Sequence, residues 1–364
     1  MNLKHLSEYR DQVICQRLVE QIARINRHDI RLMEVCGTHT MAIARNGIRE
    51  LLPSRITLLS GPGCPVCVTA QSEVDQFIQL ARIKDVIVVT FGDLMRVPGS
   101  NSSLAHARAE GCDVRVVYSA LDSLDIAEQN PRKNVVFLGV GFETTAPTVA
   151  ASVLEARRRQ LNNFFLLSAH KLVPPALHAL LQDQAVRLNG LICPGHVSVI
   201  IGARAYKPFS THYQIPCVIA GFEPADILQA ILLLVQQIEA KTPAVEIAYR
   251  RGVSPEGNVK AREIMKQVFD VVPTNWRGFG SIPLSGLKLK DEFQQFDAVD
   301  RFSIVVTNSR EPAGCICGAI LRGVQTPADC PLFQNVCTPE NPVGPCMVSS
   351  EGTCAAFYRY RVMM

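Results

Sequence analysis

The stretch Val135-Val136-Phe137-Leu138, followed by Gly141-Phe142-Glu143-Thr144-Thr145, decides the class of fold. An unbroken apolar run that is rich in β-branched residues is typical of a strand buried on both faces. The polar turn after it leads into a helical pattern over residues 147–158. Because a buried strand, a short turn and a helix make up the first part of a βαβ unit, this stretch predicts a parallel sheet.

The same order of strand, turn and helix recurs on both sides of this stretch. Helical patterns at residues 72–82 and 224–238 lie among further apolar runs, which occupy residues 56–59, 86–90, 164–167, 191–192 and 217–220. We therefore expect an α/β fold with two Rossmann-like parallel-sheet domains and a C-terminal cysteine-rich domain. We place the three domains at residues 1–130, 131–240 and 241–364, because the alternation of strands and helices stops near residue 241.

The composition excludes several classes of protein. A hydrophobic content of 48% supports large buried cores, and a formal net charge of +4 is small for 364 residues. The basic triplet at residues 157–159 falls on a predicted helix, where it is typical of a solvated face, so we expect no nucleic-acid binding. The first residues do not resemble an export signal, and the longest apolar run, residues 227–235, is shorter than the ~20 residues of a membrane span. We expect a soluble, cytoplasmic protein.

Six of the thirteen cysteines lie in the last fifty residues, in sequence rich in Pro and Gly. A metal or cluster is expected to hold this segment, because cytosolic reductants keep thiols free. The ligand candidates Cys315, Cys330, Cys337 and Cys354 are separated by 14, 6 and 16 residues. Such irregular spacing favours a [4Fe–4S] cluster over the close ligand pairs of a zinc ribbon, so we interpret this part as an iron–sulfur domain. Cys317 and Cys346 remain alternative ligands.

The motif Cys36-Gly37-Thr38-His39 brings a thiol and an imidazole into one turn. Side chains of these two types, three residues apart, can bind one metal ion. The alternative is a buried cysteine next to an ordinary histidine of the core. The motif alone leaves both interpretations open.

The motif Gly61-Pro62-Gly63-Cys64-Pro65-Val66-Cys67 lies between a predicted strand and a predicted helix. Free amide groups and the helix dipole at a helix start favour the thiolate, which suits reversible disulfide chemistry or metal binding. The alternative is half of a structural zinc site. We favour the redox or metal-handling pair, because no second Cys-x-x-Cys completes a four-ligand set.

Polar residues also follow other predicted strands. Glu143, His170 and His196 each lie in the turn that follows an apolar run. Because the carboxyl ends of parallel strands meet at one sheet edge, these residues are candidates for proton or ligand handling there. The alternatives are a carboxylate that only stabilises a helix start and histidines that are hydrogen-bonded within the core.

Five motifs together resemble the HypD family of hydrogenase maturation factors. From about residue 30 onwards they keep the family's order and spacing: CGTH at 36–39, GPGCPVC at 61–67, GFETT at 141–145, PGHVS at 194–198 and CTPENPVGPCMVSSEGTC at 337–354. The resemblance implies a scaffold that, together with the small chaperone HypC, assembles the Fe(CN)2CO group of [NiFe]-hydrogenases. Cyanide would come from HypE and HypF. Such a protein holds iron rather than converting a small substrate, so its standing as an enzyme stays open.

The resemblance also implies roles for single residues. Cys36 would share the iron with a cysteine of HypC, with His39 beside it, and Cys64 with Cys67 would form a thiol/disulfide pair that is also able to bind iron. A [4Fe–4S] cluster would pass electrons toward this pair from the ligands Cys315, Cys330, Cys337 and Cys354. The remaining candidates that lie in family motifs are Glu143, His196 and Glu351. The expected assembly is a monomer bound one-to-one to HypC.

Two other functions compete with this interpretation. The Cys64–Cys67 pair alone fits a thiol–disulfide oxidoreductase that carries an iron–sulfur cluster. The C-terminal cysteines alone fit a zinc-stabilised adaptor in which the metal serves folding only. Zinc without acid-labile sulfide would support the adaptor.

Overall fold

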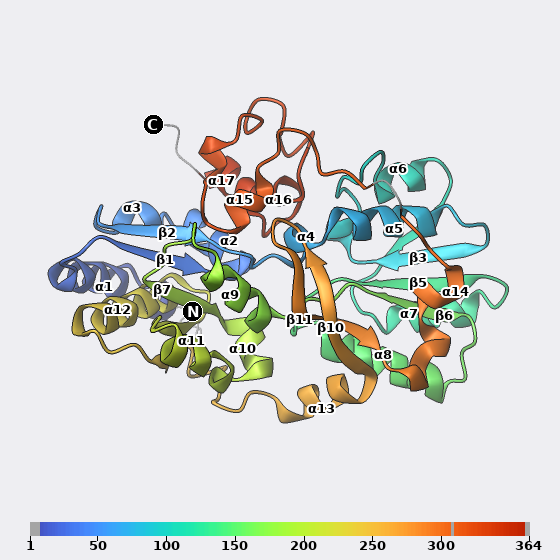
Figure 1. The fold of residues 1–364 in the computed structure, drawn as a ribbon, viewed down its shortest axis with the longest axis horizontal. Coiled ribbons are helices and arrows are strands. Elements are labelled where there is room, and N and C mark those ends of the chain that lie inside the picture. Colours follow the sequence, from blue (N-terminus) through green and yellow to red (C-terminus); the bar gives the residue numbers. More distant parts are fainter. Residues whose placement is uncertain (1–7, 307–308, 361–364) are drawn as a thin grey trace.

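The computed structural model describes residues 8–306 and 309–360, which form an α/β structure with two parallel sheets (Figure 1). The first sheet has the strand order β2 (Ile56–Ser60), β1 (Ile30–Glu34), β7 (Gly190–Pro194), β8 (Cys217–Ala220) and β9 (Val245–Ile247). The second has the order β4 (Asp113–Val116), β3 (Val86–Thr90), β5 (Asn134–Gly139) and β6 (Phe164–Ser168). Strands β3, β7 and β8 are buried along their whole length. The predicted fold class is confirmed.

The two sheets divide the chain differently from the predicted domains. The predicted boundary after residue 130 falls between β4 and β5, which belong to the same sheet. The chain leaves the first sheet after β2, builds the second sheet and returns at β7, where Gly190 pairs with Leu32 of β1. The apolar strands of both sheets look alike in sequence, and their pairing depends on contacts between distant residues. The order of elements was therefore predictable, whereas the membership of each sheet was not.

Helices pack against the sheets and link their strands. In the first sheet, α1 packs against α12, and α12 in turn contacts β7 and β8. No helix within the described ranges has both the length and the apolar character needed to cross a bilayer. The α-helices that the structure describes outside the C-terminal region are α1 (Gln12–Ile25), α2 (Gly37–Arg45), α3 (Ile48–Leu51), α4 (Pro65–Val68), α5 (Gln71–Ala81), α6 (Leu104–Ala109), α7 (Asp122–Gln129), α8 (Ala146–Arg158), α9 (Val173–Gln182), α10 (Gly195–Ile201), α11 (Lys207–His212), α12 (Pro224–Ala240), α13 (Val259–Val268) and α14 (Ala298–Phe302).

An antiparallel hairpin of β10 (Phe269–Trp276) and β11 (Gly280–Leu289) lies near the middle of the molecule (Figure 1). Its strands make isolated bridges from Trp276 to Thr69 and from Gly286 to Lys171. The amide of Leu172 donates to the carbonyl of Ser285 at 2.9 Å. The hairpin thereby fixes the loop before α5 and the loop before α9, which belong to different parts of the chain.

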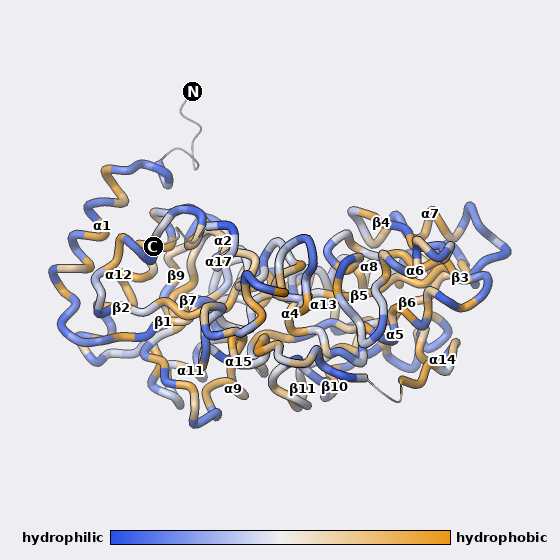
Figure 2. The backbone as a smooth tube through the Cα atoms, turned by 90° about the horizontal axis from the view of Figure 1, so that it is seen from above, coloured by the Kyte–Doolittle hydropathy of each residue, from blue (hydrophilic) through white to orange (hydrophobic). Residues whose placement is uncertain are grey.

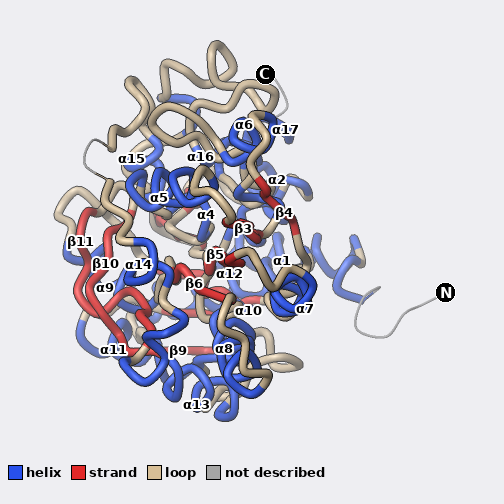
Figure 3. Tube along the Cα trace, turned by 90° about the vertical axis from the view of Figure 1, so that its right-hand side faces the viewer, coloured by secondary structure: helices blue, strands red, loops and turns tan. Residues whose placement is uncertain are grey.

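The cysteine-rich C-terminal region, residues 309–360, consists mostly of loops, drawn in tan in Figure 3. Its short helices are α15 (Cys317–Leu321), α16 (Pro345–Val348) and α17 (Thr353–Tyr360). Helix α17 contacts α2, and α16 contacts α4. The region therefore covers the two segments that carry Cys36 and the Cys64–Cys67 pair.

Figure 2 shows the two sheets toward opposite ends of an elongated body, with apolar segments running through its interior.

Candidate metal centre and thiol chain

A cleft of about 400 Å³ opens at the carboxyl ends of strands from both sheets. Segments that follow β1, β2, β5 and β7 contribute to its lining, as does the C-terminal region. Most of the lining is apolar, with a few polar groups among it. The residues around the cleft are Val35, Cys36, Thr38, Gly63, Pro65, Phe142, Thr144, Thr145, Pro194, His196, Val197, Val199, Ile200 and Glu351. Motifs that are far apart in the sequence therefore meet at this edge.

Cys36 lies at the start of α2 and faces this cleft with only 7% of its surface exposed. The amide of Gly37 donates to the carbonyl of Gly63 at 2.8 Å, which ties this loop to the Cys64–Cys67 loop. A side chain at Gly63 would collide with the backbone of Cys36, so glycine permits the close approach. Burial and the nearby Glu351 carboxylate raise the pKa of the Cys36 thiol to about 11. Near neutral pH, Cys36 is therefore a thiol, and a metal ion that bound it would have to displace its proton.

Glu351 brings a carboxyl group from the C-terminal region to the same cleft. The hydroxyl of Thr38 donates to Oε1 of Glu351 at 2.5 Å. A Cβ atom at Gly37 would lie 2.5 Å from the Glu351 Cβ, so the two segments are in direct contact. Burial raises the pKa of Glu351. The cleft thus combines a thiol and a carboxyl group that is held by a hydroxyl.

The two predicted histidines take different positions. His196 lines the cleft, whereas His39 is fully buried behind it and is not among the described residues that line the cavity. Nε2 of His39 lies 2.9 Å from the carbonyl of Gly221, and burial lowers the pKa of His39 to about 4. Phe222 stacks against both rings, with centroids 3.8 Å from His196 and 4.9 Å from His39. His39 is therefore a neutral imidazole that packs next to the cleft.

Glu143 does not point into the cleft, in contrast to the sequence prediction. Its neighbours Phe142 and Thr144 line the cleft, while Glu143 lines a separate apolar cavity of about 240 Å³ beside α9 and α13. Oε1 accepts a hydrogen bond from the amide of Val173 at 3.0 Å, at the start of α9. Burial raises the pKa of Glu143 to about 7. The helix-start alternative therefore describes its position better than a role at the cleft.

His170 is also absent from the residues described as lining the cleft. It is buried, with Nδ1 3.2 Å from the hydroxyl of Ser168, and its ring lies against Phe269. Burial lowers the pKa of His170 to about 3. These contacts match the alternative of a hydrogen-bonded core histidine.

Cys64 and Cys67 form a buried pair at the short helix α4. Their sulfur atoms lie 2.6 Å apart, and the amide of Cys67 donates to the Cys64 sulfur at 3.3 Å. The Cys64 thiol donates to the hydroxyl of Ser349 at 3.3 Å, which connects the pair to the C-terminal region. Burial raises the pKa of Cys67 well above the usual range for a thiol. The pair is close enough to interconvert between dithiol and disulfide with little movement.

Side-chain contacts continue from this pair through the C-terminal cysteines. Helix α16, which carries Cys346, contacts α4, which carries Cys67, and the two side chains lie close enough for Cys346 to influence the pKa of Cys67. The sulfur of Cys346 lies 2.7 Å from that of Cys317. Cys317 also contacts Cys315, and Cys346 contacts Cys354. We call the run Cys64, Cys67, Cys346 and Cys317 the thiol chain. It connects the cleft side of α4 with the interior of the cysteine-rich region.

All six C-terminal cysteines surround one small cavity of about 10 Å³. Within the described residues, no group of three His, Cys, Asp or Glu side chains could hold a single metal ion. Cys317 and Cys346 pair with each other, and the remaining cysteines are Cys315, Cys330, Cys337 and Cys354. The Cys337 sulfur accepts a hydrogen bond from the amide of Val343 at 3.3 Å, a contact that favours a thiolate. A thiol-rich, apolar enclosure of this kind fits the donor set of an iron–sulfur cluster.

Two parts of the site escaped sequence reasoning. Phe222, which stacks between the two histidines, follows β8 in the sequence Gly221-Phe222-Glu223, and nothing in that sequence indicates a ring beside the cleft. Ser349 lies within the quoted C-terminal motif, but its contact with Cys64 spans 285 residues. A buried hydrogen bond between residues this far apart leaves no periodic pattern in a single sequence.

Known proteins of one family resemble this chain over nearly its whole length. A family model described as "HypD: Hydrogenase formation hypA family" matches residues 13–361. The chain belongs to the HypD family. It is 46% identical to the hydrogenase maturation factor HypD of Cupriavidus necator, over 98% of this chain and 97% of that protein. A putative hydrogenase expression/formation protein of Methanocaldococcus jannaschii is 44% identical over 96% of this chain and 98% of its own length. The HypD protein of Rhodobacter capsulatus is 42% identical over 98% of both chains. The predicted family of hydrogenase maturation factors is confirmed.

Proposed function

We propose that this HypD-family chain is a scaffold on which iron acquires the cyanide and carbon monoxide ligands of the [NiFe]-hydrogenase active site. The observation that carries the proposal is the connection between two centres. A roomy cleft presents the single thiol of Cys36, and a chain of buried thiols leads from α4 beside it to the cavity of the C-terminal cysteines. A site for cargo and a source of electrons would therefore belong to one molecule.

Cys36 is the proposed ligand of the iron cargo. A soft thiolate suits low-spin iron that carries diatomic ligands. Because the pKa of Cys36 is about 11, iron binding must release the thiol proton, and the Glu351 carboxyl lies close enough to influence this step. The open volume of the cleft leaves room for a cysteine from a HypC-type chaperone on the other side of the iron. His196 lines the same cleft and can orient ligands there, with His39 packed behind it.

The Cys64–Cys67 pair is the proposed reductant next to the cleft. Conversion of this dithiol into a disulfide releases two protons and two electrons, and ligand attachment at the iron would consume the electrons. Attack by one thiolate of the Cys317–Cys346 pair on that disulfide restores the first dithiol and leaves the second pair as the disulfide. This exchange moves the disulfide from one pair to the other, so the number of electrons held by the thiol chain does not change.

The C-terminal cavity is the proposed site of a [4Fe–4S] cluster held by Cys315, Cys330, Cys337 and Cys354. Such a cluster, when bound, supplies single electrons at low potential. The contact between Cys317 and Cys346 supports their role as a redox pair rather than as ligands. Cys337 and Cys354 are buried and Cys315 and Cys330 are half-buried, so access of water to a bound cluster would be restricted, which protects thiolates from loss of the metal.

The remaining partners follow from the family. Cyanide would be delivered by HypE together with HypF, and the chain would bind HypC as a monomer in a one-to-one complex. A cytoplasmic location fits an iron–sulfur site and thirteen cysteines, because oxidising compartments would convert them to disulfides.

A second candidate function is a thiol–disulfide oxidoreductase with an iron–sulfur cluster. The buried contact of Cys67 with Cys346 favours it, since two adjacent thiol pairs suit electron transfer to a disulfide substrate. This alternative predicts thioredoxin-linked turnover that survives replacement of Cys36. The scaffold predicts that replacement of Cys36 abolishes function even when both thiol pairs remain intact.

An infrared spectrum of the anaerobically purified complex with its co-expressed HypC-type partner tests the proposal. We expect carbonyl and cyanide stretching bands in the wild-type complex and their loss in Cys36→Ala. Cys217→Ala, which alters a buried cysteine of β8 outside the thiol chain, serves as the matched control and keeps the bands. Bands that persist in Cys36→Ala would refute the assignment of the cargo site.

A further inference from the structure

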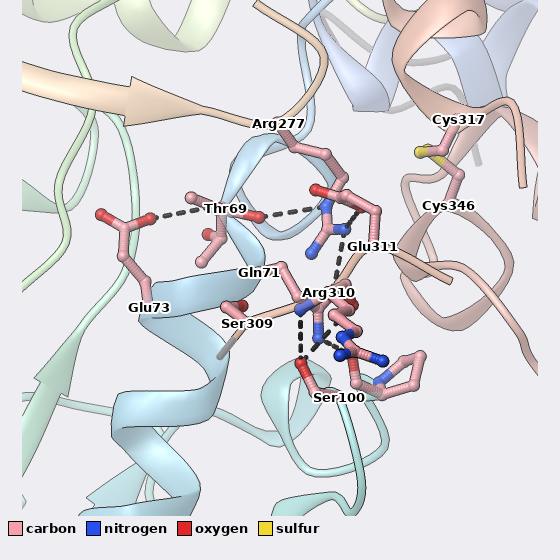
Figure 4. A network of polar contacts seen from close by, with 12 residues as sticks. Thr69, Gln71, Glu73, Ser100, Arg277, Ser309, Arg310, Glu311, Cys317 and Cys346 are labelled. Atoms are coloured by element: carbon pink, nitrogen blue, oxygen red, sulfur yellow. Dashed lines mark hydrogen bonds and ion pairs between the residues drawn. The ribbon is translucent and has the colours of Figure 1, made fainter. Parts of the chain in front are cut away.

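The turn of the β10–β11 hairpin contacts the thiol-bearing helix α4 directly. The amide of Arg277 donates to the carbonyl of Val68, the last residue of α4, at 2.9 Å. Nε of Arg277 donates to the carbonyl of Thr69, the next residue, at 3.1 Å (Figure 4). Thr69 also bridges to Trp276. The hairpin turn therefore holds the end of the Cys64–Cys67 helix through its backbone.

The guanidinium of Arg277 is buried and anchored on several sides. Its side chain is 1% exposed. Nη1 donates to Oε1 of Gln71 at 3.0 Å and forms an ion pair with Glu311, a residue of the C-terminal region (Figure 4). Burying a cation is costly unless several acceptors fix it, and here acceptors from α5, the loop before it and the C-terminal region do so. Two nitrogens of the guanidinium, Nε and Nη1, reach these acceptors, while Nη2 is buried without a partner among the described residues. The single ammonium group of a lysine does not have the two separate donors at these positions.

The same turn touches the helix that carries Cys317. Gly278 has φ +80°, and a Cβ atom there would lie 2.4 Å from the Cα of Gly318. Gly318 follows Cys317 in α15. On its other side, Trp276 stacks on Phe142 of the cleft, with centroids 6.0 Å apart. The turn thus lies in contact with α4, α15 and one wall of the cleft.

We infer that Arg277 is a positioning residue that keeps Cys67 within reach of Cys346. The guanidinium fixes α4 to the hairpin turn and to Glu311, while the glycine contact fixes the turn to α15. Without this guanidinium, the two thiol pairs retain their own short connections but lose their common orientation. The inference rests on the proposed function, because the contact matters only if electrons pass between the two pairs.

Disulfide trapping in the full-length, cluster-loaded protein tests the inference. The parent variant Cys64→Ser/Cys317→Ser leaves Cys67 facing Cys346 without their usual partners. Diamide accepts two electrons and two protons from these thiols, and mass spectrometry quantifies the Cys67–Cys346 disulfide with time. Adding Arg277→Gln is expected to slow this cross-link at least tenfold. In the chain with all its cysteines, Arg277→Gln should leave formation of the Cys64–Cys67 disulfide within twofold of wild type, because that pair lies within one helical turn.

Matched variants distinguish a positioning effect of Arg277 from an effect of its charge and from a general destabilisation of the fold. Arg277→Lys keeps the charge but not the planar guanidinium, and formation of the Cys67–Cys346 disulfide should remain as slow as in Arg277→Gln. Arg322→Gln, which breaks an ion pair with Asp183 at the other end of α15, should keep the parent rate. Glu311→Gln, at an exposed position, should slow the cross-link by a smaller factor. Thermal unfolding of each variant reports whether the fold is retained.

The outcomes are distinguishable. An unchanged cross-linking rate in Arg277→Gln, full rescue by Arg277→Lys, or an equal fall of both disulfides would overturn the positioning role. A parent variant that never forms the Cys67–Cys346 disulfide would refute the thiol chain itself, and the positioning role with it. Failure of the infrared test alone would refute the cargo site and leave the role of Arg277 intact.

Discussion

The cleft and the cysteine-rich region both depend on thiols, but they are built in opposite ways. The cleft is framed by the ends of buried strands and offers about 400 Å³ around one thiol. The C-terminal cavity is framed by loops and encloses about 10 Å³ among six thiols. A preformed space with one soft ligand suits a cargo that comes and goes, whereas a loop region crowded with thiols depends on a resident group for its order. Under the proposed function, this difference would make the cleft the place where the cargo is held and the cysteine-rich region the source of electrons.

The largest expected effect comes from removing a proposed cluster ligand. Cys337→Ala should abolish acid-labile sulfide and make limited proteolysis within residues 309–360 about tenfold faster, because the loops lose their common anchor. Chemical analysis of iron and sulfide, combined with timed proteolysis, measures both effects. Cys36→Ala should leave sulfide and proteolysis unchanged, and a joint loss in the two variants would remove the distinction between the regions.

Breaking the thiol chain should have the next largest effect. We expect Cys67→Ala to lower hydrogenase activation by at least about tenfold, because the reductant next to the cleft is lost while Cys36 and the cluster remain. The measurement is hydrogenase activity in cells that express only the variant. Cys217→Ala should stay near the wild-type level, and an equal fall in both variants would point to general destabilisation instead.

A smaller effect is expected from the carboxyl group beside Cys36. The Glu351 carboxylate disfavours the Cys36 thiolate, so Glu351→Gln should lower the pKa of Cys36 from about 11. At pH 8, alkylation of Cys36 by iodoacetamide should become about three- to tenfold faster, because the thiolate fraction increases. The Thr38→Ser control keeps the hydroxyl that donates to Glu351. A slower reaction in Glu351→Gln would contradict the proposed electrostatic coupling.

The smallest effect concerns Glu143, outside the cleft. The pKa of Glu143 in the folded protein is about 7, above the ordinary value of 4.5, so the fold favours the neutral carboxyl. The wild-type protein therefore loses stability as the pH rises from about 4.5 through 7. As the pH rises from 5 to 8, the free energy of unfolding of Glu143→Gln should therefore increase by roughly 1–3 kcal/mol relative to that of the wild type. Urea unfolding at both pH values measures this difference. A difference that does not depend on pH would show that Glu143 is ionised throughout.

The fold class and the residue types of the candidate site could be predicted from the sequence. The direction in which the individual side chains point could not. Continuous apolar runs predict buried parallel strands because burial on both faces is a local property of composition. Whether Phe142 or Glu143 points into the cleft depends on how the turn after β5 is packed, which one sequence does not record. Arg277 likewise lacks a local signal, since its partners Thr69 and Glu311 are brought together only by the folded hairpin.

A Mössbauer spectrum of ⁵⁷Fe-loaded protein, purified anaerobically with its HypC-type partner, tests the separation of the two regions most directly, because one spectrum distinguishes cluster iron from low-spin iron with diatomic ligands. For Cys36→Ala, we predict that the low-spin component disappears while the cluster component keeps its wild-type intensity. Retention of the low-spin component, or loss of both components together, would contradict the assignment of cargo to the cleft and of the cluster to the C-terminal cysteines.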